Sequence, residues 1–198
     1  MLNLKTIIIA ALIPVAAMSQ DWSIEYHRGL KPKQSGELSV SLYGDKVFSH
    51  AFLPISTPYR KSIPRSAMVE AIIVISEDAG SIWGSDPMGE MGGVIIPASI
   101  GLILHDSWYG VNGRWYSTQR ITIKPGAHRL LVPVDKYAWT NVYTKTGVAT
   151  AQTKRAFNDS WTSPTRIGVC AGGNFYGHGI EMLAGSGSIT VKCLRIIK

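Results

Sequence analysis

The chain has 198 residues, of which 45% are hydrophobic and 17% charged, and its formal net charge is +7 at pH 7. This balance excludes an intrinsically disordered or fibrous protein and suits one globular domain. The positive charges are scattered along the sequence rather than gathered in a run, so the charge does not indicate a nucleic-acid partner.

The first residues follow the three-part pattern of a secretory signal peptide. Lys5 supplies a positive charge, residues 6–15 form an apolar run, and Ala17-Met18-Ser19 offers small residues for cleavage. The apolar run is shorter than the about 20 residues that a transmembrane helix needs, and Pro14 interrupts it. We therefore predict that residues 1–19 are removed. Residues 20–198 then form a single domain of a secreted or periplasmic protein with no membrane span in its mature form.

The rest of the chain is dominated by strand-like segments rich in β-branched and aromatic residues and bounded by Gly, Pro or Ser. These segments are 22–28, 37–43, 46–53, 67–75, 101–109, 120–124, 128–134, 166–171, 179–183 and 188–197. Residues 80–97 are too rich in Gly and Pro for regular structure and are expected to form a long loop. Residues 149–161 have apolar side chains at helical spacing without an internal Gly or Pro, which predicts one short amphipathic helix.

This pattern predicts an all-β fold, a two-sheet antiparallel jelly-roll sandwich with one short helix. The clearest hairpin spans residues 108–116, where Asn112-Gly113 can adopt the positive φ angles of a tight turn.

Aromatic residues near loops and the hairpin are the first candidates for a binding site. Sugars stack their C–H faces on flat rings while polar side chains fix their hydroxyls. The candidate ligand-binding residues are Trp83, Trp108, Tyr109, Trp115 and Tyr116, with Asn112 and Arg114 beside them. The structural alternative is that these rings form cross-strand pairs that stabilise the hairpin.

The glycine-rich stretch 172–179 contains the second set of candidates. It lacks the Lys-Ser or Lys-Thr of a phosphate-binding loop. Its glycines either let strand ends bend sharply or present Asn174, Tyr176 and His178 at the surface.

Catalytic and metal-binding signatures are missing from the sequence. We find no Gly-x-Ser-x-Gly, no His-Glu-x-x-His and no paired metal-ligand spacing, so no catalytic residue, metal site or cofactor is predicted. An enzyme would need titratable groups that meet in a cleft, with His105, His178 or Tyr176 as candidates. A structural calcium ion stays open, although isolated aspartates such as Asp45 and Asp78 form no recognisable site.

The chain has two cysteines, Cys170 and Cys193, and both lie in strand-like segments of the exported part. A disulfide between them is the first expectation, and two buried free thiols are the alternative.

The C-terminal half, from about residue 100 to 198, resembles exported bacterial β-sandwich domains of the galactose-binding-like, carbohydrate-binding-module type. The matching runs are LVPV at 131–134, WTNVY at 139–143, KTG at 145–147, RIGV at 166–169, GGNFYGHGI at 172–180 and GSITV at 187–191. The resemblance implies a jelly-roll sandwich and carries over no ligand-contacting residue, because this fold hosts binding modules, lyase appendages and structural domains alike.

These observations together predict a secreted, non-catalytic domain that binds an extracellular or cell-envelope polysaccharide. A polysaccharide-degrading enzyme, either a lyase or a glycosidase, and a structural cell-envelope module stay open as alternatives.

Overall fold

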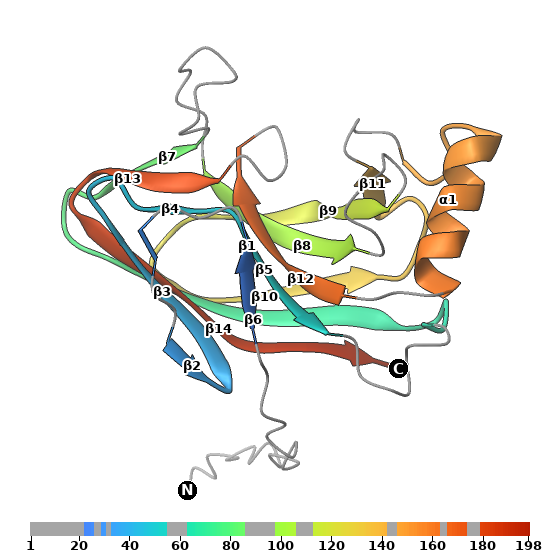
Figure 1. Ribbon diagram of the computed structural model, residues 1–198, viewed down its shortest axis with the longest axis horizontal. Coiled ribbons are helices and arrows are strands. Elements are labelled where there is room, and N and C mark those ends of the chain that lie inside the picture. Colours follow the sequence, from blue (N-terminus) through green and yellow to red (C-terminus); the bar gives the residue numbers. More distant parts are fainter. Residues whose placement is uncertain are drawn as a thin grey trace, which may run out of the picture.

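The computed structural model describes residues 22–25, 29–30, 33–54, 63–85, 98–105, 113–141, 146–162, 166–173 and 179–198. These contain fourteen strands and one helix (Figure 1). In chain order they are β1 (Ser23–Glu25), β2 (Lys33–Ser35), β3 (Glu37–Tyr43), β4 (Val47–Phe48), β5 (His50–Pro54), β6 (Met68–Glu77), β7 (Ile82–Ser85), β8 (Ser99–His105), β9 (Arg114–Thr122), β10 (Gly126–Pro133), β11 (Trp139–Asn141), α1 (Ala151–Thr162), β12 (Arg166–Gly172), β13 (Ile180–Ala184) and β14 (Ser186–Ile197).

Two antiparallel sheets form the sandwich. One has six strands in the order β1-β5-β12-β8-β9-β11, and the other has five in the order β10-β6-β14-β3-β2. Eight strands of these two sheets face each other in the order of a jelly roll, with β5-β12-β8-β9 opposite β10-β6-β14-β3. The predicted all-β jelly-roll sandwich is therefore confirmed.

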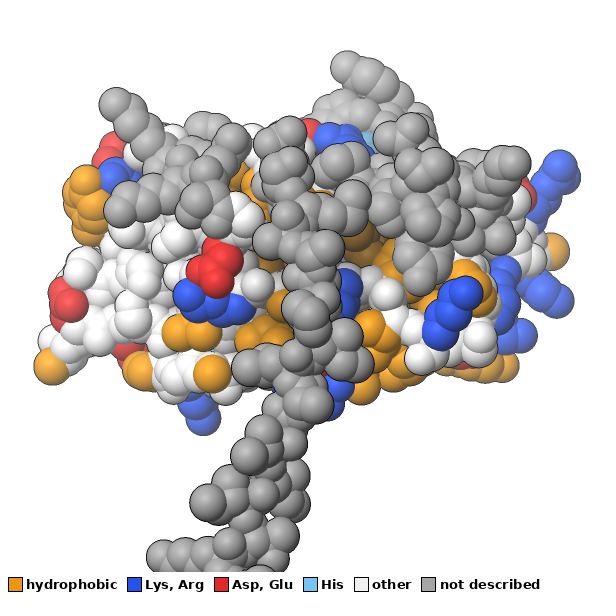
Figure 2. All heavy atoms as spheres, turned by 90° about the horizontal axis from the view of Figure 1, so that it is seen from below, with side chains coloured by type: hydrophobic (Ala, Val, Ile, Leu, Met, Phe, Trp, Pro, Cys, Tyr) orange, Lys and Arg blue, Asp and Glu red, His pale blue; other side chains and the backbone are white. Residues whose placement is uncertain are grey.

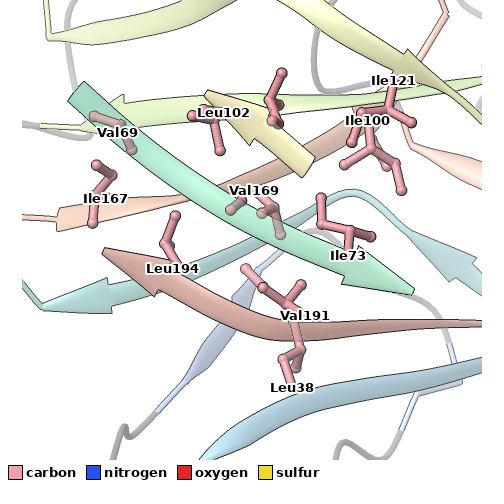
Figure 3. Close-up of a cluster of buried hydrophobic side chains, with 14 of the residues drawn as sticks. Leu38, Val69, Ile73, Ile100, Leu102, Ile121, Ile167, Val169, Val191 and Leu194 are labelled. Carbon is pink, nitrogen blue, oxygen red and sulfur yellow. The ribbon is translucent and has the colours of Figure 1, made fainter. Parts of the chain in front are cut away.

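The core lies between the two sheets and is built from strands with a period of two. In β6, Val69, Ala71, Ile73 and Ile75 are at most 2% exposed, while the intervening residues face the other side of the sheet. Figure 3 shows how side chains such as Val69, Ile73 and Val191 meet those of the opposite sheet, including Leu102 and Val169. Burying apolar side chains in this way is the main stabilising contribution to such a fold.

The two ends of the sandwich are occupied by different elements. A three-stranded sheet of order β4-β13-β7 lies at one end, and α1 lies at the opposite end (Figure 1). The helix begins after Thr150, whose hydroxyl accepts a hydrogen bond from the Thr153 backbone N–H at 3.1 Å, while the Thr153 hydroxyl accepts one from the Thr150 N–H at 2.8 Å. This reciprocal cap satisfies two amide donors at the helix start.

The helix packs on the sandwich through its aromatic side chains. The ring of Phe157 meets Trp115 edge to face at 5.1 Å between centroids, and Trp161 meets Trp139 in the same way at 5.0 Å. The predicted amphipathic helix over residues 149–161 is thus confirmed within two residues at each end.

Most predicted strands are present, and the differences have local causes. The single strand expected at 46–53 is two strands, β4 and β5, which separate at Ser49 and join different sheets. The loop expected at 80–97 contains β7, which pairs with β13. The predicted hairpin pairs β8 with β9 through Ile103↔Tyr116 and His105↔Arg114, while its turn residues lie outside the described part of the chain.

The surface carries its charge in small groups. Figure 2 shows isolated Lys, Arg, Asp and Glu side chains, with more Lys and Arg at the end where Figure 1 places α1. On the outer face of the five-stranded sheet, the Glu70 carboxylate is only 3% exposed and accepts hydrogen bonds from Arg129 at 2.7 Å and Arg195 at 2.6 Å. Burial alone would raise the pKa of Glu70, but the hydrogen bonds and charges of the two arginines outweigh burial and lower it.

The one helix of the described residues, α1, has 12 residues, and no helix in that part of the chain is long and apolar enough to cross a membrane.

Candidate functional site

The predicted hairpin aromatics do not form an exposed platform. Trp115 is 0% exposed in the main core, where its indole N–H donates to the Ser160 hydroxyl at 3.0 Å. Tyr116 is 1% exposed on the opposite side of β9, in a cluster with Phe52, Ile103 and Cys170. Neither ring is exposed as the sequence predicts, because alternation along β9 sends them to opposite faces and each face is buried at that point.

The other predicted ligand-binding residues are less enclosed or lie outside the described residues. Trp83 is half-buried in β7, and its indole N–H donates to a Glu77 carboxylate oxygen at 2.5 Å. Its ring lies so close to Gly187 that an added Cβ would come within 2.5 Å of it, which gives Trp83 a packing role. Arg114 is half-buried on β9. The residues outside the described part are Trp108, Tyr109, Asn112, Asn174, Tyr176 and His178.

The expected disulfide is absent, since Cys170 and Cys193 are both free thiols. Cys170 belongs to the six-stranded sheet and is buried on its outer face, whereas Cys193 belongs to the five-stranded sheet, half-buried beside Glu70 and Arg195 on its outer face. The sandwich core separates two outward-facing thiols, so they cannot meet. Burial raises the pKa of both thiols.

An open pocket of about 250 Å³ lies at one end of the five-stranded sheet. It spans three adjacent strands, β3, β14 and β6, and we call it the hydroxyl groove. Its lining residues are Ser41, Leu42, Tyr43, Ser76, Glu77, Asp78, Ser186, Gly187 and Ser188.

Strand register places the polar side chains of the groove in rows. Ser188 lies opposite Ser41 on one side and Ser76 on the other, so three hydroxyls stand side by side across neighbouring strands about 4.8 Å apart. The Ser76 and Ser188 hydroxyls are hydrogen bonded at 2.5 Å. In the next row, Ser186 lies opposite Tyr43.

The Asp78 carboxylate of the groove is held in place by the protein itself. The Ser186 hydroxyl donates to Asp78 at 2.5 Å, and the Asp78 backbone N–H donates to the Ser186 carbonyl at 3.0 Å. Glu77 shares the inward face of Ile75 and lies opposite Gly187, so its carboxylate, which accepts the hydrogen bond from Trp83, is on the other face of the sheet from the serines. The contacts of Asp78 fix one charged acceptor beside the row of hydroxyls, which is a suitable arrangement for binding a polyhydroxylated molecule.

Tyr43 supplies an aromatic ring at the edge of the groove. It is 52% exposed, and the Lys46 ammonium lies over its ring at 3.4 Å from the centroid. The sequence contains a signal for this residue, because Glu37 to Tyr43 alternates polar and apolar residues and Tyr43 shares its face with Ser39 and Ser41. Tyr43 is not among the rings predicted to bind ligand, which lie near loops and the hairpin.

His105, a candidate acid or base, lies on the outer face of the six-stranded sheet and is 1% exposed. Burial lowers its pKa to about 4, with smaller contributions from the charges of Arg166 and Arg114. Arg166 contacts the ring at Nδ1 at 3.2 Å, and since a guanidinium only donates, Nδ1 is the acceptor and Nε2 carries the proton of the neutral ring. The other candidates, His178 and Tyr176, lie outside the described residues.

A cluster of metal ligands is not present among the described residues, where no three His, Cys, Asp or Glu side chains are placed to hold one ion.

No family model and no curated protein matches this chain. Three solved structures are similar at low sequence identity. One, PfGH50B, is 10% identical with a TM-score of 0.44, and the match covers 91% of this chain and 23% of that one.

The second comes from a study of endo-acting O-glycanases that prominent members of the human gut microbiota express to initiate mucin breakdown. It is 10% identical with a TM-score of 0.45, and the match covers 96% of this chain and 95% of that one. The third is the family 11 carbohydrate-binding module of the Clostridium thermocellum cellulase Lic26A-Cel5E, which is 9% identical with a TM-score of 0.36 over 88% of this chain and 82% of the module. All three TM-scores lie below 0.5, so these likenesses assign neither a family nor a function to the chain.

Proposed function

We propose that this chain is a secreted or periplasmic, non-catalytic domain that binds an extracellular or cell-envelope polysaccharide, and that the hydroxyl groove is its binding site. The observation that carries the proposal is the exposed ring of Tyr43 at the edge of a pocket lined by serine hydroxyls and the Asp78 carboxylate.

The chemistry of the groove matches the two kinds of surface that a sugar presents. The apolar C–H face of a pyranose can pack on the exposed part of Tyr43, while its hydroxyls exchange hydrogen bonds with the serines and donate to Asp78. The serines lie on three hydrogen-bonded strands, so the polar groups are positioned before the ligand arrives and little ordering free energy is lost on binding.

The lining of the groove favours binding over hydrolysis. A glycosidase normally needs two carboxyl groups on opposite sides of the scissile bond. Here Asp78 is the carboxylate beside the serines, Glu77 points to the other face of the sheet, and the other lining residues are Leu42, Gly187, Tyr43 and serines. The described lining therefore offers no second carboxyl group across from Asp78.

The test is affinity electrophoresis of the protein in gels that contain a panel of neutral polysaccharides. We expect retention by at least one of them, and Tyr43→Ala should weaken it about fivefold, equivalent to about 1 kcal/mol for the loss of an aromatic contact. Tyr137→Ala is the matched control, because Tyr137 is 62% exposed and lies outside the groove. Equal weakening by both variants, or no retention by any polysaccharide, would contradict the proposal.

A polysaccharide-degrading enzyme is the second candidate function. The observation that favours it is the neutral His105 ring on a face that also holds His50 and Tyr116, whose rings lie 6.3 Å apart. Incubation with polysaccharide and an assay for reducing ends and unsaturated products separates the two functions. Products that form with the wild-type protein and not with His105→Gln would favour the enzyme.

A further inference from the structure

A second polar site lies on the outer face of the six-stranded sheet, far in the fold from the hydroxyl groove. There His105 of β8 pairs with Arg166 of β12 on one side and with Arg114 of β9 on the other. Because neighbouring strands are about 4.8 Å apart, the two arginines stand roughly 10 Å apart with the histidine between them. Burial lowers the pKa of the ring most, and the charges of Arg166 and Arg114 lower it further, so both guanidinium groups are close enough to act on the ring.

The charges described on this face are mainly positive. Arg114, Arg120 and Arg166 are the cations, and Glu25, which forms an ion pair with Arg166, is the one carboxylate among the described residues of this face. Arg120 lies over Gly101 and donates to the Ser99 hydroxyl at 2.7 Å. Three guanidinium groups against one carboxylate favour an anionic partner.

Buried apolar side chains, including Phe52 and Ile103, lie beneath the arginines on this face. The guanidinium of Arg166 lies 4.6 Å from the centroid of the Phe52 ring, and the edge of Phe52 meets His105 at 5.6 Å. Phe52 and Ile103 are both 0% exposed. The Arg166 side chain nevertheless stays 27% exposed, and Arg114 is half-buried, so neither residue is fully enclosed. An apolar floor strengthens the attraction between a guanidinium and an oxyanion above it.

We propose that Arg114 and Arg166 form a binding site for the carboxylate or sulfate groups of an acidic polysaccharide. Guanidinium groups bind such oxyanions through their charge and their N–H donors. In Arg166, Nη1 already donates to Glu25 and Nη2 to His105, so this residue contributes its charge and its remaining N–H groups. The separation of the two arginines lets one polymer, with an anionic group on each repeat, engage both of them. This site is independent of the hydroxyl groove, so either site can fail without the other.

The test compares retention in gels that contain polygalacturonate, dextran sulfate or neutral dextran at physiological salt. We expect retention by an anionic polymer and not by dextran, and a loss of about tenfold in Arg114→Gln. Arg155→Gln is the matched control, because it removes the same charge from a side chain that is 88% exposed on α1. It should change retention less than about twofold, as expected for one screened surface charge. Tyr43→Ala should bind the anionic polymers as the wild-type protein does.

NMR titration of the His105 ring gives a readout that general charge attraction would not move. An oxyanion bound between Arg114 and Arg166 offsets their charges, so oligogalacturonate or inorganic sulfate should raise the pKa of His105 in the wild-type protein. Arg114→Lys keeps the charge and should retain part of the binding, which shows that the position itself can be substituted in a folded protein.

Each outcome decides the proposal. Retention by polygalacturonate alone identifies the carboxylate as the ligand group, and retention by dextran sulfate alone identifies the sulfate. Equal losses in Arg114→Gln and Arg155→Gln, equal retention of Tyr43→Ala by neutral dextran and by the anionic polymers, or an unchanged pKa of His105 on saturation would each overturn it.

Discussion

The buried ring of His105 should make the folded protein less stable as the pH falls below about 6.5. The ring is 1% exposed, the charges that face it are those of Arg166 and Arg114, with Glu25 behind Arg166, and its pKa in the folded protein is about 4. In the unfolded chain the ring titrates near its ordinary value of 6.5. The unfolded state therefore takes up a proton first as the pH falls, and this uptake favours unfolding.

The size of the effect follows from the two pKa values. Well above pH 6.5 the ring is neutral in both states and makes no contribution to the pH dependence. Between pH 6.5 and 4 the free energy of unfolding falls, by about 2 kcal/mol at pH 5 and by about 3 kcal/mol once the pH is below 4. At pH 5 the Glu70 carboxylate stays charged in the folded state, because its pKa is below the ordinary 4.5, so this pH isolates the histidine best.

The assay is urea unfolding of the wild-type protein and His105→Gln at pH 7.5 and pH 5. A glutamine cannot take up the proton, so the variant should lose about 2 kcal/mol less than the wild-type protein between the two pH values. The comparison at pH 7.5 corrects for any change in packing that the substitution causes. If both proteins lost the same stability, the ring would not be held neutral by its burial and its arginine neighbours, and the reasoning would be wrong.

Two further predictions concern stability and are measured by urea unfolding at pH 7. Removing both Arg129 and Arg195 by alanine substitution leaves the Glu70 carboxylate buried without its partners, and should destabilise the protein by about 3 kcal/mol or more. Glu70→Gln leaves two solvated arginines and should destabilise it by only about 1 to 2 kcal/mol. The reverse order would contradict the assignment of Glu70 as the buried charge. Gly168→Ala would place a Cβ 2.1 Å from a backbone carbonyl oxygen and should lower the free energy of unfolding by at least about 2 kcal/mol. Gly101→Ala would meet only side-chain atoms, at 3.0 Å and beyond, and should lower it by less. Equal losses of stability would show that the contact at residue 168 relaxes.

The parts of the fold that were predictable are those with a local cause. The alternation in β3 and β6 fixes which side chains face the core, and the helical spacing with a Thr150 cap fixes α1. The same alternation also assigns Trp115 and Tyr116 to opposite faces of β9. It does not tell whether a face is covered, because that depends on elements distant in sequence, such as α1 over Trp115.

The sequence likewise does not show whether the two cysteines can form a disulfide. The neighbours of Cys170, Val169 and Ala171, are core residues, which places its thiol on an outer face. Which sheet each cysteine joins follows from long-range strand pairing, and the pairing sends Cys170 and Cys193 to different sheets. A sequence with only two cysteines contains no local signal for this separation.

The hydroxyl groove could be predicted only in part. The polar face of β3, including Tyr43, is visible in the sequence, but the alignment of Ser41, Ser188 and Ser76 depends on the register of three strands that are far apart in the chain. A site assembled by register leaves no contiguous motif.

The most direct test of the central claim is to locate the bound glycan by NMR. Amide signals of the 15N-labelled protein should be followed while a retained neutral polysaccharide, cut to oligosaccharides, is added to saturation. The hydroxyl groove predicts that the largest shifts fall on Tyr43, Ser41, Ser76 and Ser188. Saturable binding that leaves these four amides unchanged would contradict the account.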